Sequence, residues 1–91
     1  MASPVIDAAL VPLRMTASGL VKAGGGVARR VVCAASSSGT LTIYDNTTAS
    51  APIILNAFPL SAGQSYQLDA IFQTGCYVAI GGTADITFLY Y

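Results

Sequence analysis

Apolar and polar residues alternate at every second position along most of this 91-residue sequence. That period places successive side chains on opposite faces of an extended strand, whereas a helix would need a period of about 3.6 residues. The clearest instance runs from Thr40 to Tyr44 and predicts a strand with Leu41 and Ile43 facing the core. The alternation therefore predicts an all-β protein.

Glycines, prolines and short polar clusters divide the sequence into segments that each suit one strand. We expect strands over residues 13–21, 28–35, 40–44, 53–55, 66–73, 76–80 and 85–91. Ser36-Ser37-Ser38-Gly39 is expected to form a loop, and Gly81-Gly82 is expected to close a tight hairpin. Strands of this length and spacing predict a single small antiparallel β-sandwich, jelly-roll-like, with about six to seven strands.

The start of the chain differs from the rest. Pro4 and Pro12 punctuate the first dozen residues, where the alternation is weak. We expect residues 1–12 to form an extended N-terminal arm that lies on a neighbouring subunit, and residues 13–91 to form the sandwich domain. Asp7 lies where a secretory signal peptide would need a cationic or apolar region, so the protein is expected to be made in the cytoplasm.

The last predicted strand, residues 85–91, carries apolar or aromatic side chains on both faces. Ile86, Phe88 and Tyr90 lie on one face, and Thr87, Leu89 and Tyr91 lie on the other. An antiparallel strand beside solvent usually has one polar face. This strand is therefore either central in the sandwich or covered on one side by a neighbouring subunit. By contrast, residues 53–55 follow Pro52 and are expected to form an edge strand, because proline cannot donate to a neighbouring strand.

Charge is scarce in this sequence. Charged residues make up 9% of the chain, against roughly 25% in an average soluble protein, while apolar residues reach 54%. The formal net charge is zero, which disfavours nucleic acid and anionic membranes as partners. No stretch long enough to cross a bilayer as a helix is free of charges and turn residues. A nearly neutral surface favours association, so we expect a protein partner to cover part of it.

The sequence offers few groups for catalysis, since it has four Asp, no Glu and no His. Asp45 and Asp85 lie at predicted strand ends, where Asp commonly supports turns. Asp69 lies within a strand, opposite Leu68, and is expected to be solvated, with an ion pair to an Arg at an interface as the alternative. The serine cluster has no His to activate a nucleophile. We therefore expect neither enzyme activity nor a cofactor.

Metal and phosphate sites are not expected either. Cys33 and Cys76 are too few and too far apart for a zinc site, which needs four ligands. Without a secretory signal they are expected to be buried thiols rather than a disulfide. The run Gly24-Gly25-Gly26 is followed by Val27, not by the Lys-Ser/Thr of a phosphate-binding loop.

Aromatic side chains provide the best candidates for a functional surface. Tyrosine joins a large apolar area to a polar tip and is enriched at protein interfaces. Arg29 and Arg30 point to opposite faces of a strand, so they form no one-sided basic patch. The interface candidates are Tyr44, Tyr77, Leu89, Tyr90, Tyr91 and Arg30. The alternative for the tyrosines is that they cover an open end of the sandwich.

Two stretches resemble small structural proteins of tailed bacteriophages. The first is SGTLTIYDNTTA, residues 38–49, and the second is FQTGCYVAIGGTADIT, residues 72–87. The resemblance spans residues 31–91, about two-thirds of the chain. Its motifs are strands and turns, so no functional residue is carried over from that group.

The resemblance implies a β-sandwich on the outside of an icosahedral capsid. We expect a capsid decoration or cement protein, made in the host cytoplasm, that binds the major capsid protein and stabilises the shell, often as a homotrimer. Related small β-proteins also serve at the phage neck or in head and tail fibres. The alternative is therefore a neck or fibre module whose outward tyrosines bind a receptor or glycan. An enzyme with a metal held by Asp residues is the third interpretation.

Overall fold

The computed structural model describes residues 10–91, and most of them lie in strands. The strands are β1 (Val11–Met15), β2 (Gly19–Ala23), β3 (Gly26–Tyr44), β4 (Ile53–Pro59), β5 (Ser65–Phe72) and β6 (Gly75–Tyr90). All pairings are antiparallel and join the six strands into one sheet. The predicted all-β class and the number of strands are confirmed. Within the described range there is no helix long and apolar enough to span a bilayer.

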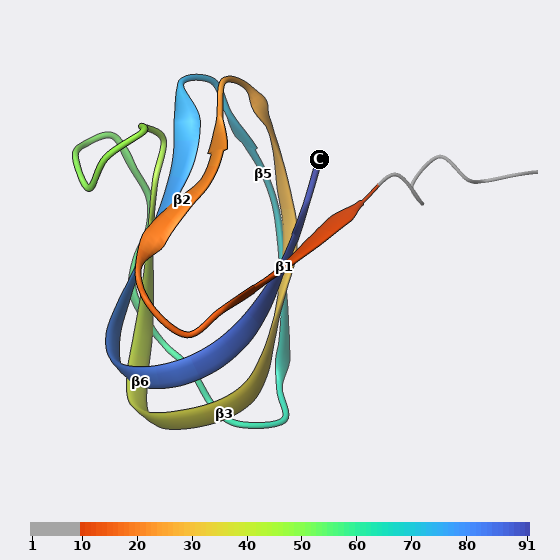
Figure 1. Cartoon of the computed structure of the whole chain (residues 1–91), viewed down its shortest axis with the longest axis vertical. Coiled ribbons are helices and arrows are strands. Elements are labelled where there is room, and N and C mark those ends of the chain that lie inside the picture. Colours follow the sequence, from red (N-terminus) through yellow and green to blue (C-terminus); the bar gives the residue numbers. More distant parts are fainter. Residues whose placement is uncertain (1–9) are drawn as a thin grey trace, which may run out of the picture.

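The long strands β3 and β6 pair along most of their lengths and organise the sheet. In Figure 1 both strands curve through the lower end of the molecule, so that the sheet folds over on itself. Layer one consists of β1, the second half of β6, the first half of β3 and β5. Layer two consists of β2, the first half of β6, the second half of β3 and β4. This arrangement is compatible with the expected sandwich, and the jelly-roll connectivity stays a prediction.

The bend lies where the sequence suggested interruptions. The register of β3 against β6 shifts between Ser37 and Thr40, and both Ser38 (φ 55°) and Gly82 (φ 67°) adopt left-handed backbone. The predicted loop at residues 36–39 and the predicted hairpin at Gly81-Gly82 are wrong, because both segments remain inside strands. Small and glycine residues permit a sharp turn, but here they let two paired strands bend together.

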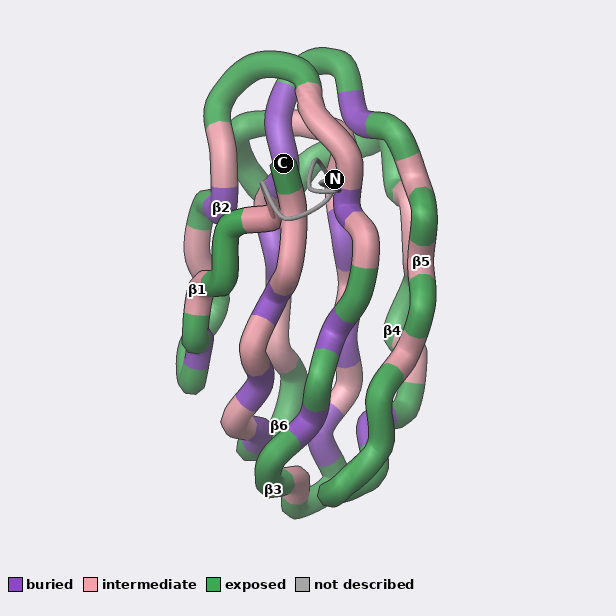
Figure 2. Tube along the Cα trace, turned by 90° about the vertical axis from the view of Figure 1, so that its right-hand side faces the viewer, coloured by how far each residue is buried: buried purple, intermediate pink, exposed green. Residues whose placement is uncertain are grey.

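The core fills the space between the two layers. Figure 2 shows buried residues recurring along β3 and β6 between more exposed ones. Leu41 and Ile43, which were predicted to face the core, are at most 1% exposed, and so are Val31, Val78 and Phe88. The expectation that both cysteines are buried is also confirmed. The buried cluster is Met15, Val21, Ala28, Val31, Cys33, Leu41, Ile43, Leu60, Phe72, Cys76, Val78, Ala84, Ile86 and Phe88.

The first and last of the described strands, β1 and β6, are neighbours in the sheet. The single strand predicted over residues 13–21 is in fact two strands, because the chain turns at residues 16–18 and moves from layer one to layer two. β1 begins at Val11, within the predicted arm of residues 1–12, and residues 1–9 of that arm lie outside the described range. β6 lies between β1 and β3, which confirms a central position for the last strand. β4 pairs only with β3, as an edge strand should.

The bend generates a test at Gly82. A Cβ there would contact the backbone carbonyl oxygen of Ser38, and the residue also has positive φ. Gly63 has a similar φ of 82°, but no heavy atom lies within 4 Å of its would-be Cβ. Gly63→Ala should lower the free energy of unfolding by about 1 kcal/mol for the backbone alone. Gly82→Ala should lower it by about 2 kcal/mol or more, because the strand opposite must also move.

Urea unfolding of both variants measures this difference. Equal losses for Gly63→Ala and Gly82→Ala would show that the close approach of β3 and β6 at the bend contributes nothing beyond the backbone preference.

Candidate functional site

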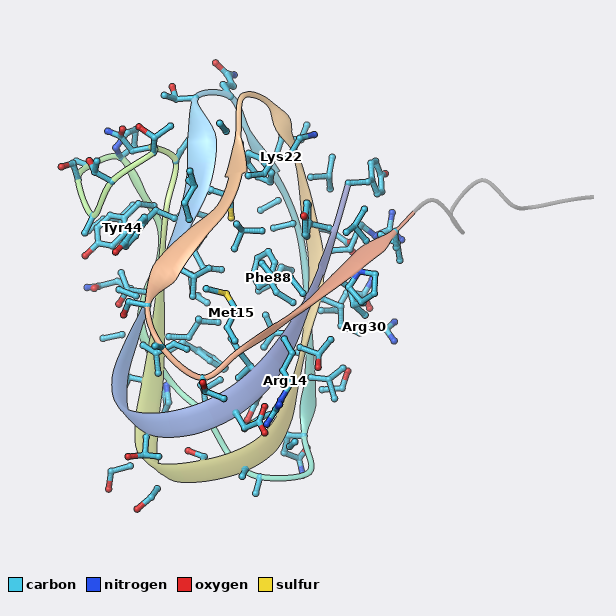
Figure 3. All side chains as sticks on the ribbon, in the orientation of Figure 1. Arg14, Met15, Lys22, Arg30, Tyr44 and Phe88 are labelled. Atoms are coloured by element: carbon cyan, nitrogen blue, oxygen red, sulfur yellow. The ribbon has the colours of Figure 1, made fainter. Side chains whose placement is uncertain are left out.

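Strand alternation leaves one outward set of side chains on each layer. We call them the layer-one face and the layer-two face. The layer-two face comprises Leu20, Thr40, Thr42, Tyr44, Ile53, Tyr77 and Ala79. The layer-one face comprises Pro12, Arg14, Val27, Arg30, Val32, Gln67, Asp69, Ile71, Asp85, Thr87, Leu89 and Tyr91. Figure 3 places Tyr44 and Arg30 on opposite sides of the molecule.

Four large side chains form a continuous row across the layer-two face. Leu20 on β2 is in register with Tyr77 on β6, Tyr77 with Tyr44 on β3, and Tyr44 with Ile53 on β4. The tyrosine rings are 6.4 Å apart between centroids and tilted by 57°. Leu20 and Ile53, at the two ends, are 44% and 49% exposed. We call this row the layer-two ladder.

The layer-two face carries no charged side chain among the described residues. The ion pairs Arg14–Asp85 and Arg29–Asp69 belong to layer one, and so does Arg30. Lys22 is in register with the inward-facing Cys76, and Figure 3 shows it on the side of β2 away from Tyr44. The ladder is therefore an uncharged apolar and aromatic strip that runs over four strands.

Asp45 follows the ladder residue Tyr44 and points to the β5–β6 turn. Its Oδ1 accepts hydrogen bonds from the backbone N–H groups of Gln73 (2.9 Å), Thr74 (2.8 Å) and Gly75 (3.3 Å). The Thr74 bond is the main cause that lowers the pKa of Asp45; desolvation opposes it, and the bonds from Gln73 and Gly75 add to it. The expectation that Asp45 supports a turn is confirmed.

Arg30 occupies the middle of the layer-one face. It pairs in register with Leu89 on β6 and with Gln67 on β5, and the next outward residue on β3, Val32, is 38% exposed. Arg30 is itself exposed, and no carboxylate of the described residues forms an ion pair with it. Two predicted interface candidates, Arg30 and Leu89, thus lie side by side.

A strand irregularity beside Arg30 brings three other groups together. Ala28 pairs with Tyr90 and Arg30 with Leu89, so Arg29 is an extra residue on β3. Its Nε lies 2.9 Å from Oδ1 of Asp69, and its guanidinium lies 6.0 Å from the centre of the Tyr91 ring. The alternative expected for Asp69, an ion pair with an Arg, is realised within the chain rather than across an interface. Asp69 is also exposed on the outward face, as the expectation of a solvated carboxylate had it.

The end of layer one is the most exposed apolar region. Ile71 is 71% exposed and pairs with Val27, whose backbone exchanges hydrogen bonds with Tyr91. Tyr91, another predicted candidate, is 39% exposed. Tyr90 differs from the other candidates, because it is half-buried against the core with its ring 6.2 Å from that of Phe88.

Arg14 and Asp85 close the other end of the layer-one face. Two guanidinium nitrogens of Arg14 donate to the two carboxylate oxygens of Asp85, at 3.0 and 2.8 Å. This hydrogen bonding lowers the pKa of Asp85 and raises that of Arg14. Asp85 was expected at a strand end that supports a turn. That expectation is wrong, because β6 continues through the bend and leaves Asp85 in mid-strand.

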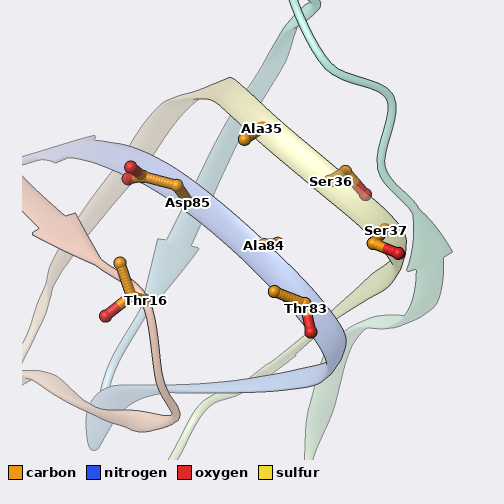
Figure 4. A pocket seen from close by; sticks show the side chains of 7 residues that line it. All are labelled: Thr16, Ala35, Ser36, Ser37, Thr83, Ala84 and Asp85. Carbon is orange, nitrogen blue, oxygen red and sulfur yellow. The ribbon is translucent and has the colours of Figure 1, made fainter.

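A pocket of about 280 Å³ lies on the bend and is shown in Figure 4. Its lining is Thr16, Ala35, Ser36, Ser37, Thr83, Ala84 and Asp85. Ser36 Oγ donates to the carbonyl of Leu60 and accepts from the N–H of Gly39, and Arg14 holds Asp85. Ser36 and Asp85 are thus already bonded within the protein, and the hydroxyls of Thr16, Ser37 and Thr83 complete the polar lining.

The thiol of Cys76 and the possible metal ligands of the described residues form no reactive site either. Burial, followed by the nearby charge of Asp45, raises the pKa of the Cys76 thiol to about 12, so it stays protonated near neutral pH. Residues 10–91 contain no cluster of three His, Cys, Asp or Glu placed to hold a metal ion. The two outer faces are the surfaces with the clearest capacity to bind something.

Asp45 yields a prediction about stability and pH. Asp45→Ala should lower the free energy of unfolding by about 1 kcal/mol, because three backbone donors lose a charged acceptor. The folded pKa of Asp45 is depressed, so its contribution is present above the unfolded pKa and is lost as pH falls through the folded pKa. Urea unfolding from about pH 7 to about pH 2 should show wild type and Asp45→Ala converging in acid.

Asp45→Asn provides the control, since it keeps an acceptor oxygen but loses the charge. Its free energy of unfolding should lie between those of the other two proteins near neutral pH. A gap between wild type and Asp45→Ala that stays constant down to acid pH would contradict the assigned role.

Comparison with known proteins adds no constraint. No family model matches the chain, and neither a curated protein nor a solved structure matches it. The two outer faces and the sequence resemblance are therefore the basis for the functional proposal.

Proposed function

We propose that this protein is a capsid decoration, or cement, protein of a tailed bacteriophage that binds the major capsid protein on the capsid exterior and stabilises the shell. The observation that carries the proposal is the layer-one face, where Arg30 has no carboxylate partner among residues 10–91 and lies among outward apolar side chains. Leu89 and Val32 flank it, and Ile71 and Tyr91 extend the apolar area. The resemblance of residues 31–91 to phage structural proteins indicates the kind of partner.

The chemistry of this face suits a protein surface that bears a carboxylate. Arginine is enriched at protein interfaces because its planar guanidinium binds carboxylates through two parallel hydrogen bonds. The neighbouring aliphatic side chains exclude water from such a pair and add apolar burial. The flanking ion pairs, Arg14–Asp85 and Arg29–Asp69, are already neutralised within the chain. Arg30 therefore offers the charge that a partner can use.

The fold gives such a protein a mechanical role. Both layers share the strands β3 and β6, so the folded sheet presents its two outer faces in a fixed relation. A rigid body that contacts two capsid subunits adds bonds that must break before the subunits separate. Several weak contacts made together raise the avidity without requiring a single strong one.

The alternative, a neck or fibre module that binds a receptor or glycan, would use the tyrosine pair of the layer-two ladder. Sugar rings stack best on an aromatic ring that lies flat beneath them. Tyr44 and Tyr77 are tilted by 57° to each other, so one sugar cannot lie flat on both rings. This geometry makes the glycan function the second candidate.

Arg30→Glu tests the proposed contact. The reversed charge should weaken binding to the shell at least about tenfold, because it meets the partner carboxylate as a like charge. Lys22→Glu makes the same change in net charge on a cation outside the layer-one face and should bind as wild type does. Co-sedimentation with shells assembled from the major capsid protein of the same phage measures both affinities.

The stabilising role has its own readout. Shells with bound protein should lose their integrity at a higher temperature than bare shells, and Arg30→Glu should give a smaller shift at equal concentration. Wild-type protein that fails to sediment with these shells would refute the proposal. Unchanged binding of Arg30→Glu would refute the role of the layer-one face.

A further inference from the structure

The layer-two ladder is a surface that the proposed shell contact does not use. It lies on the side of the molecule opposite Arg30 (Figure 3). Its ends, Leu20 and Ile53, are nearly half exposed. We infer that a second copy of this chain covers the layer-two face, so that the ladders of two molecules stack against each other about a twofold axis.

The distribution of charge favours a second copy of this chain as the partner of the layer-two face. A twofold interface places the same patch on both sides, so any charge near the axis would face itself and repel. The layer-two face has no charge among the described residues, whereas the layer-one face carries both signs. A neutral face is compatible with its own copy, and the zero net charge of the chain removes long-range repulsion between copies.

The shape of the side chains agrees with face-to-face packing. The ladder is a ridge of Leu20, Tyr77, Tyr44 and Ile53. The next outward residues, Ala79 and Thr42, are small and lie in register with each other. A twofold rotation would place the ladder of one copy over Ala79 and Thr42 of the other copy. The side chains of the two faces would then interdigitate, as those of stacked sheets do.

The area is sufficient for a weak dimer. Residues 75–81 of β6 span roughly 23 Å at about 3.3 Å per residue, and four strands about 4.8 Å apart span roughly 19 Å. A flat patch of that size covers roughly 440 Å², so two copies bury roughly 900 Å². Specific interfaces begin near about 1,000 Å². We therefore expect a dimer in equilibrium with the monomer rather than an obligate one.

This inference is independent of the proposed capsid contact, because the two faces point in opposite directions. It also differs from the trimer that the resemblance implies. In a threefold ring the ladder would meet a different surface of the next copy, and such a surface would not need to be free of charge.

Ile53→Asp and Ile71→Asp form a matched pair of variants. Both replace an exposed isoleucine of a strand with a carboxylate, one on the ladder and one on the layer-one face. Sedimentation velocity from about 1 to about 500 μM should show the wild-type mass rising from 9.3 kDa toward twice that value. Ile53→Asp should raise the dimer dissociation constant at least about tenfold, and Ile71→Asp should leave it unchanged.

Leu20→Asp, at the opposite end of the ladder, repeats the test on another strand, and cooperative urea unfolding shows that each variant is folded. A wild-type monomer over the whole concentration range would overturn the inference, and so would a trimer. Dimers that survive both ladder substitutions would overturn it too. Co-sedimentation of Ile53→Asp with shells separates the proposals, since shell binding that persists without dimers supports the layer-one contact alone.

Discussion

The antiparallel pairing of β3 with β6 is the constraint on which the rest of the structure depends. Each of the other four strands pairs with one of these two and with no other strand. The core residues of both layers also come largely from them. Because the two strands bend together and pair on both sides of the register shift between Ser37 and Thr40, their pairing builds two layers. The positions of both outer faces follow from that pairing.

The sequence predicted the local properties of the fold and missed its connectivity. Alternation in residues 40–44 and 76–80 identified the buried face correctly, because burial on one side of a strand imposes a period of two. The same reasoning failed at residues 36–39 and 81–82. Serine and glycine occur both in turns and in bends, and only the partner strand decides between them. Here β3 and β6 pair on both sides of the bend. The expected loop at residues 36–39 and the expected hairpin at Gly81-Gly82 are therefore parts of one bend in two paired strands.

The candidate surfaces were predictable to a similar degree. The alternation placed Tyr44 and Tyr77 on an outward face, and they lie there side by side. The contribution of Leu20 and Ile53 to the same row depends on the register of four strands, which no local pattern encodes. Arg29 meets Asp69 because an extra residue on β3 shifts the alternation. Bulges of this kind are set by tertiary pairing, so the sequence suggested an Arg partner for Asp69 but could not show that Arg29 provides it within the chain.

The bend also determines how the molecule carries load. In a sandwich made of two separate sheets, tension between the outer faces is borne by interdigitated side chains and by the loops at the ends. Here the backbones of β3 and β6 cross from one layer to the other, so a pull on one face reaches the other through covalent bonds. Peeling the layers apart would require both strands to straighten together at Ser38 and Gly82, which makes the corner the point where tensile resistance is concentrated.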